Sequence, residues 1–392
     1  MSKRPLKLPF WLSILLGGLL VLWLASGLIS QKAIHIEGKS PNTHLLNLGA
    51  PLPDQRAAAR ELILRHPERF MDHCLKLVES QPTQVERWLA RLRGALATSS
   101  VGRWVKVAPP YWEQQTRLMA FECMTLLDPS FSQIQPLLAI GIRDPNHQIR
   151  MESAKCLANQ GEEGLPLLKT LLQDADPSVR HVGFYAAYKM GVHAIGAVDL
   201  LVACLLDDQQ LEPDPLLYEV FAQLGSQAVP SLGDRLHQAS RPMRLRLLRA
   251  MIPLGARTVA YQRWFLQGMQ DELPAMRSLA AQAFFASGWI DKEAYAAIFP
   301  LLEDEDRAVR LKALELMDTR SAYAEPSVPS LLSLLNDDDP AIRQRAERLI
   351  QRVPVEQDIT RQLFNQAAST GNAYVQEVVT RKLNQIGQMP AS

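Results

Sequence analysis

One phrase returns along this chain at a nearly constant spacing, and it constrains the fold more than any other feature. It runs from Asp337 through Pro340 to Arg343, and it recurs in the segments that end at Arg310 and Arg180. With the final residue of the phrase as a marker, successive copies lie 33, 30, 34, 30, 33, 33, 33 and 33 residues apart. The markers are Arg117, Arg150, Arg180, Asp214, Arg244, Arg277, Arg310, Arg343 and Gln376. A period in this range is typical of a repeat protein, whose units bury their apolar faces against one another.

The polar half of the phrase predicts the start of a helix. Four residues before the marker stand side chains whose oxygens cap free N–H groups: Asn146, Asp176, Ser240, Asp306, Asp339 and Asn372. Proline follows in three copies, at the first helical position, where a missing N–H group costs nothing: Pro177, Pro274 and Pro340. We therefore predict that a helix begins about three residues before each marker.

The residues around and after the marker predict how that helix is buried and where it ends. Positions one before, three after and seven after the marker are mostly apolar or small, as in Val309, Ala313 and Met317. This spacing places one apolar stripe along a helix. Eleven residues after the marker, a glycine predicts a left-handed turn at the helix end: Gly161, Gly191, Gly225, Gly255, Gly288 and Gly387.

A second apolar run lies between that glycine and the next phrase, as in Val229 to Leu236. Proline stands fourteen residues before the marker in four copies and again predicts a helix start: Pro136, Pro166, Pro230 and Pro329. Each repeat is therefore predicted to be two antiparallel helices, which we name helix A and helix B, with the marker on helix B.

The full pattern, Val-Pro-x-Leu-x-x-Leu-Leu-x-Asp-x-Asp-Pro-x-Val-Arg followed by Ala and Gly, resembles the short HEAT repeat of phycobilin-lyase-like proteins over about residues 110–388. This resemblance implies an all-α, right-handed α-solenoid of antiparallel helix pairs over residues 111–388. It also implies that the Asp and Arg columns form a ladder that joins the turns of adjacent repeats, rather than a catalytic site.

Residues 8–29 contain no charged side chain. A helix of this length, at about 1.5 Å per residue, spans a hydrocarbon layer of roughly 30 Å. Trp11 and Trp23 lie towards its ends, where indole rings suit the membrane interface. The alternative is a cleaved signal peptide, whose apolar region runs only about 7–15 residues. We predict a single-pass transmembrane signal anchor.

The flanking charges predict the orientation of this anchor. Three basic residues lie within residues 1–7, whereas only Lys32 and Lys39 follow closely after it. The positive-inside rule then predicts a cytoplasmic N-terminus and a periplasmic body at a bacterial inner membrane. The remaining segments are predicted to be a polar tether at 30–53, an atypical helical cap at 54–110 and a loose tail at 389–392.

Composition argues against several functions. The chain has 42 basic and 41 acidic residues, so no strong field attracts nucleic acid. The eight histidines show no metal-binding spacing, and the four cysteines form no CxxC pair and are predicted to be buried thiols. No phosphate-binding loop or nucleophile motif is present. We therefore expect no enzyme activity, no metal and no cofactor.

The remaining candidate is the surface of the B helices, which is predicted to line the concave face of the solenoid. Its positions outside the apolar stripe carry basic and aromatic side chains, which are frequent binding anchors: His181, Tyr185, Lys189, Arg246, Arg249, Lys312, Arg345, Arg348, Arg352 and Arg381. Solvation of exposed charges is the plainer interpretation of the same residues.

These observations favour a membrane-anchored scaffold that binds another protein through the concave face and the lipid bilayer through residues 8–29. The alternative is a chromophore lyase or isomerase of the phycobilin-lyase type, which depends on likeness of fold alone. Ser13 and Gly17 also have the small-residue spacing that mediates self-association of membrane helices.

Overall fold

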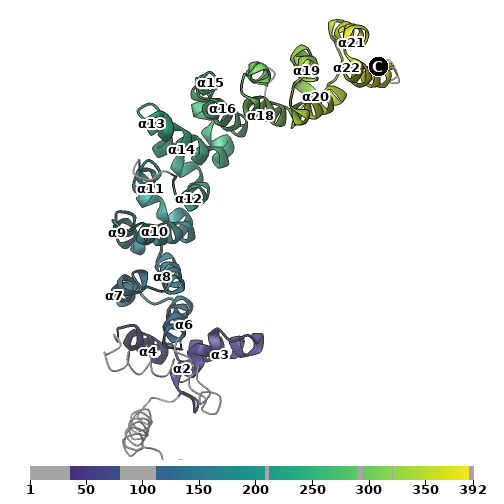
Figure 1. The fold of residues 1–392 in the computed structure, drawn as a ribbon. Coiled ribbons are helices and arrows are strands. Elements are labelled where there is room, and N and C mark those ends of the chain that lie inside the picture. The colour runs from purple at the N-terminus through teal and green to yellow at the C-terminus, as the bar shows by residue number, and fades with distance from the viewer. Residues whose placement is uncertain (1–35, 80–111, 208–211, 289–294, 320, 388–392) are drawn as a thin grey trace, which may run out of the picture. The chain divides into compact units, whose positions relative to one another are not determined.

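The computed structural model describes residues 36–79, 112–207, 212–288, 295–319 and 321–387 (Figure 1). Within these ranges the chain forms α-helices and 3-10 helices, with one isolated bridge between Ile36 and Lys39. The chain divides into two compact units, residues 1–164 and 165–392. The predicted all-α class is therefore confirmed for the part of the chain that is described.

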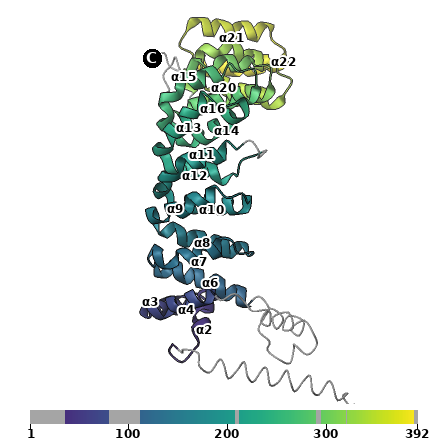
Figure 2. The ribbon, with the colours of Figure 1, turned by 90° about the vertical axis from the view of Figure 1, so that its left-hand side faces the viewer.

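The first unit contains the N-terminal helices of the array. They are α2 (Pro41–Leu48), α3 (Pro53–Arg65), α4 (Pro67–Glu79), α6 (Trp112–Leu127), α7 (Phe131–Ile142), α8 (His147–Asn159) and the 3-10 turn η1 (Gly161–Gly164). Helix α4 packs against α6 and α7 packs against α8, while α6 also contacts α8 (Figure 2). Helices α7 and α8 are the A and B helices of one repeat, and α6 and α8 are the B helices of neighbouring repeats.

The predicted tether at 30–53 is wrong where the structure describes it, because α2 and the start of α3 lie there. The Arg56 guanidinium donates through Nη1 to the carbonyls of Ala50 (2.6 Å) and Pro51 (3.0 Å), as a marker arginine does. Helices α2 and α3 thus form a further pair ahead of the regular array. The pattern is hidden in the sequence because Leu52 occupies the N-cap position without a capping side chain.

The second unit contains a series of further helix pairs. Its helices are α9 (Leu165–Leu172), α10 (Pro177–Met190), α11 (Val198–Leu205), α12 (Leu216–Leu224), α13 (Val229–Leu236), α14 (Arg241–Met251), α15 (Gln262–Gly268), α16 (Pro274–Ala286), α18 (Arg307–Asp318), α19 (Val328–Leu334), α20 (Pro340–Arg352), α21 (Asp358–Thr370) and α22 (Ala373–Gly387). The 3-10 segments between them are η2 (Gly191–Ala197), η3 (Gly225–Ala228), η4 (Ile252–Tyr261), η5 (Phe299–Glu303), η6 (Ser321–Tyr323) and η7 (Glu325–Ser327). The even-numbered helices from α10 to α22 are B helices, and each contacts the next one along the unit (Figure 1).

The helix starts follow the predicted capping pattern in most repeats. Asp176, Asp306 and Asp339 each accept a hydrogen bond from a backbone N–H group in the first turn of their helix. Two details of the prediction are wrong. Ser240 holds the N-cap position but makes no capping bond. Pro136 lies inside α7, because that helix begins five residues earlier, at Phe131.

The helix ends depend on glycine, as predicted, at all of the expected positions except the last. Gly191 has φ 56° and ψ −126°, and Gly255 has φ 59° and ψ −134°. Side chains with a Cβ atom disfavour this mirror-image region, whereas glycine enters it freely. The chain leaves helix B there and enters a short 3-10 turn before the next helix A. Gly387 instead remains within α22.

The apolar stripe forms the core between helices. Val309, Ala313 and Met317 on α18 are at most 1% exposed, so the predicted inward face is confirmed. The predicted thiols Cys74, Cys123 and Cys156 are also buried, whereas Cys204 is half-buried.

The predicted anchor at 8–29, the N-terminal segment 1–7 and the tail 389–392 lie outside the described residues. Within the described ranges, the run Pro177–Leu205 is long and apolar enough to cross a membrane by length and composition. This run consists of α10, η2 and α11, and it is broken at Gly191 by the positive φ given above. Among its apolar residues, Val182 and Leu201 are buried in the core of the repeats, whereas Val192 is exposed.

Candidate functional site

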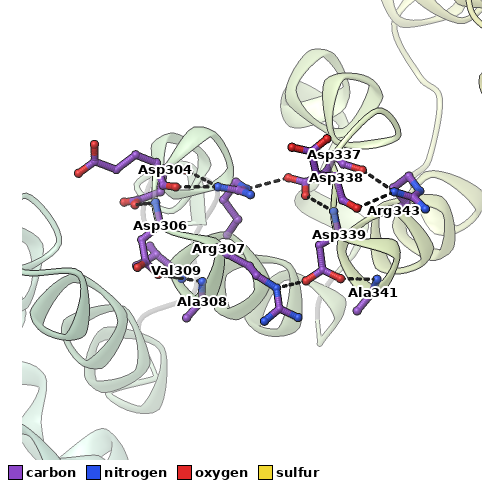
Figure 3. Close-up of polar contacts among 12 residues, drawn as sticks. Asp304, Asp306, Arg307, Ala308, Val309, Asp337, Asp338, Asp339, Ala341 and Arg343 are labelled. Carbon is purple, nitrogen blue, oxygen red and sulfur yellow. Dashed lines mark hydrogen bonds and ion pairs between the residues drawn. The ribbon is translucent and has the colours of Figure 1, made fainter.

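The Asp and Arg columns form the expected ladder between adjacent turns. Arg310 donates through Nη1 to the carbonyls of Asp304 (2.8 Å) and Glu305 (3.0 Å) in its own turn. Its Nε then donates to Asp337 Oδ2 in the next repeat at 2.8 Å. One guanidinium therefore holds its own turn and reaches the following one. Figure 3 shows the two turns, with Asp304 in one and Asp337 in the other.

The aspartate of each pair also has two contacts. Asp337 Oδ1 accepts from the backbone N–H group of Asp339 at 2.8 Å, and Asp339 in turn caps α20 through the N–H group of Ala341. Arg307 forms an additional pair with Asp339 (Figure 3). The columns thus join turn, helix cap and neighbouring repeat, which is the structural role that the resemblance implied.

The pair between Arg277 and Asp304 is the most buried in the second unit. Arg277 donates through Nε to Oδ2 (2.6 Å) and through Nη2 to Oδ1 (2.7 Å), and the two side chains are 11% and 6% exposed. Burial by itself raises the pKa of the Asp304 carboxyl, but the bonds from Arg277 and from the Asp306 amide hold that pKa below its usual range. The same bond to Asp304 raises the pKa of Arg277. In the first unit, Arg117 forms the equivalent pair with Asp144 at 2.9 Å.

The predicted binding residues on α10 are engaged with their surroundings. His181 Nδ1 lies 2.6 Å from Asp214 Oδ2, a residue that stands at a marker position in the next repeat. The Lys189 ammonium lies over two aromatic rings, 5.5 Å from the centroid of Tyr185 and 5.3 Å from that of Tyr188. Lys189 is exposed, so this basic and aromatic group reaches solvent. Cation–π contacts of this kind contribute about 0.5–1 kcal/mol at exposed sites.

The predicted residues on α14 also have partners. Arg246 donates through Nη1 to the carbonyls of Asp207 (2.7 Å) and Leu205 (3.3 Å). Arg249 lies 3.6 Å from the carboxylate of Glu212. The sequence interpretation missed Glu212, because it considered the basic residues of each B helix alone. Glu212 lies in the loop before α12, in the repeat that precedes α14.

The C-terminal group of arginines does not form a free basic strip. Arg352 lies 2.6 Å and Arg348 lies 3.9 Å from the carboxylate of Asp318 on α18. Lys312 pairs with Glu315 at 2.8 Å. Arg381 pairs with Glu347 and with Glu377, each at 2.8 Å. Arg345 makes no hydrogen bond or ion pair with any described residue. The surface of the B helices is therefore a mosaic of paired charges.

The described ranges contain no candidate metal centre. No group of three or more His, Cys, Asp or Glu side chains there is placed to hold a metal ion. The predicted binding residues are brought onto successive B helices, α10, α14, α18, α20 and α22, rather than into one pocket.

Comparison with known proteins gives the class of this fold. Residues 134–212 and 262–351 match the family model described as HEAT repeats. These two stretches are therefore similar to HEAT repeats, and the described helices around them form the antiparallel pairs of an all-α solenoid.

Solved structures with a similar fold include three karyopherin-type solenoids. The Kap95:Nup1 complex matches with 11% identity and a TM-score of 0.48, over 89% of this chain and 54% of that chain. Importin beta matches with 14% identity and a TM-score of 0.41, over 88% and 60%. Kap121p bound to Nup53p matches with 12% identity and a TM-score of 0.44, over 93% and 51%.

This chain thus spans about half the length of the first of these structures, and the likeness concerns the fold alone. The comparison with curated proteins gave no match.

Proposed function

We propose that this protein is a scaffold that docks another protein along the B helices of its HEAT repeats, tethered to a membrane by residues 8–29. It carries no catalytic role in this proposal. The observation that supports it most is the group formed by Lys189, Tyr185 and Tyr188 on α10, which presents a cation and two aromatic rings together on the B face. Extended faces of solenoids are where such proteins bind their partners.

The tether has support from the sequence only, through the uncharged run 8–29 and the basic residues before it. In this proposal the N-terminus is cytoplasmic and the repeats lie in the periplasm of a bacterium, next to a membrane or envelope complex. Cysteine labelling of residues 3 and 39 with a reagent that does not cross membranes tests this orientation. Labelling at residue 3 but not at residue 39 in intact cells would contradict it.

Photo-crosslinking in cells tests the docking face. A photoreactive amino acid replaces Lys189 on α10, and the matched control replaces Lys169, an exposed lysine on helix A of the same repeat. A second pair of positions is Arg345 on α20 and Ser333 on α19. We expect a discrete crosslinked product from the B positions and none from the A positions. Equal crosslinking from both faces, or none from either, contradicts docking on the B helices.

A further inference from the structure

The ladder aspartates follow the marker arginines in the sequence. The aspartate six residues before a marker pairs with the marker arginine of the preceding repeat at three places in the described residues, which are Arg117–Asp144, Arg277–Asp304 and Arg310–Asp337. Seven markers are arginine, and six of them are followed by such an aspartate. The interior marker that is not arginine, Asp214, is followed by Gln238, so the aspartate is lost where the arginine is lost. Arg343 is the exception, because Thr370 stands where its aspartate is expected.

The guanidinium of Arg343 is positioned like those of the paired markers. Its Nη1 donates to the carbonyls of Asp337 (2.7 Å) and Asp338 (3.0 Å), as Arg310 does to its own turn (Figure 3). Its Nε and Nη2 atoms make no hydrogen bond or ion pair with any residue that the structure describes. In Arg277, these two atoms are the ones that hold a carboxylate.

The following repeat does not supply a substitute for the missing aspartate. Helix α21 continues to Thr370, whose hydroxyl donates to the carbonyl of Gln366. Asn372 caps α22 through the N–H group of Val375, and its side-chain amide donates to Asn336. The polar groups of this turn are therefore used locally, and none of these bonds reaches Arg343.

An open cleft of about 890 Å³ lies beside Arg343, between α20 and α22. Its lining includes Glu347 and Tyr374, and these are bonded to each other at 2.8 Å, while Arg381 neutralises the same Glu347. Asp338, also in the lining, is exposed. Repulsion from these acidic neighbours and attraction to Arg343 both scale with the charge of an incoming anion, so the planar, bidentate fit that a carboxylate makes with Arg277 favours that group here rather than charge alone.

We propose that Arg343 is the receptor for one carboxylate side chain, an aspartate or glutamate on the surface of the docked protein. The incoming group takes the place that a ladder aspartate holds in the preceding repeats, with a planar, bidentate geometry that suits guanidinium. This inference depends on the proposed function, since it names the chemistry of one contact with the docked protein. It also places that contact at the junction of the last two repeats.

The test follows the Nε–Hε NMR signals of arginine in the full-length, 15N-arginine-labelled protein. The probe is N-acetyl-aspartate amide, with N-acetyl-asparagine amide as the neutral control. We expect a saturable shift of the Arg343 signal with the first probe only, and no shift of Arg310, the paired arginine at the same repeat position. The absence of a shift at Arg343, or equal shifts at both arginines, overturns the proposal.

Two other anions test whether Arg343 prefers a side-chain carboxylate to a terminal carboxylate or a phosphate. N-acetyl-alanine supplies a terminal carboxylate, and inorganic phosphate supplies a dianion. If either anion half-saturates the Arg343 shift at a lower concentration than N-acetyl-aspartate amide does, the assignment to an acidic side chain is overturned. Weaker shifts with both support it.

Asp337→Asn provides a gain-of-binding variant. The asparagine oxygen retains the bond from the Asp339 amide, but the charge that holds Arg310 is removed. We expect the Arg310 signal of this variant to shift with N-acetyl-aspartate amide, as Arg343 does in the natural protein. An unchanged Arg310 signal overturns the idea that a marker arginine without its aspartate is sufficient to bind a carboxylate. Loss of crosslinking at Lys189 with an intact Arg343 response would instead reject the proposed docking function and leave the carboxylate site standing.

Discussion

Substitution of Asp304 by asparagine measures how much the ladder contributes to stability. The variant keeps the size of the side chain and the oxygen that accepts from the Asp306 amide, but it removes the charge that pairs with Arg277. Hydrogen bonds to charged groups contribute about 1.5–3 kcal/mol, and breaking a buried ion pair costs about 3–5 kcal/mol. Since asparagine still offers Arg277 one acceptor, we expect a loss of about 2–3 kcal/mol in the free energy of unfolding.

The loss should be local, because each repeat of a solenoid depends mainly on its neighbours. Hydrogen exchange of backbone amides in α16 and α18 is the appropriate assay, with urea unfolding of the whole chain beside it. The expected cost corresponds to exchange that is roughly 30- to 150-fold faster in these two helices. The control is Asp338→Asn, the same chemical change at an exposed position. Equal exchange in the two variants would refute the ladder as a source of stability.

The pH dependence gives an independent check on Asp304. Its pKa in the folded protein lies below its usual value, because burial raises the pKa but the bonds from Arg277 and the Asp306 amide together lower it further. A carboxyl of this kind contributes stability above the unfolded pKa of about 3.9 and loses it as the pH falls through the folded pKa. The difference between the natural protein and Asp304→Asn should be full at pH 6 and should shrink below about pH 4. A difference that stays constant to pH 2 contradicts this account.

Four further substitutions test other parts of the structure. Phe284→Ala opens a cavity at a side chain that is 1% exposed and should cost about 3–5 kcal/mol, measured by thermal melting. Arg348→Glu alters an exposed side chain and should melt close to the natural protein; a larger loss than for Phe284→Ala would reverse our assignment of inside and outside. Gly233→Ala places a Cβ atom 1.9 Å from the Tyr261 ring and should cost about 1–3 kcal/mol in urea unfolding. Burial lowers the pKa of Lys382, so its contribution to stability should rise with pH as the pH approaches the unfolded value of about 10.4, and Lys382→Met should remove this rise.

The sequence predicted those features that depend on residues within a few positions of one another. The cap at Asp306 and the buried stripe from Val309 to Met317 lie within one helix, so their spacing along the chain fixes their geometry. The ladder was predicted from the resemblance, and its atoms follow from the same phrase in consecutive repeats. Helix α2 was missed, and α3, which lies in the predicted helical cap, was not recognised as part of a repeat, because Arg56 keeps the turn contacts of a marker while Leu52 lacks the capping oxygen.

The charge pairs on the B helices were not predicted, because they depend on how one repeat stacks on the next. Arg352 pairs with Asp318, and Arg381 pairs with Glu347; each pair is separated by 34 residues, which is one repeat and one position. This offset is invisible when each helix surface is considered alone. Opposite charges at that offset are the signal in the sequence from which these pairs can be found.

This mutual pairing decides where a docked protein can gain affinity. A partner that takes Arg381 away from Glu347 exchanges one exposed ion pair for another, and such pairs contribute only about 0–1 kcal/mol. A group that meets an arginine with free donors forms a bond without breaking one. Within the described residues, Arg345 and the open edge of Arg343 have this property, whereas the unbonded Nε atoms of Arg150 and Arg244 are buried away from an incoming group. The selectivity of the surface is therefore expected to depend on these interruptions in the repeat pattern more than on its many paired charges.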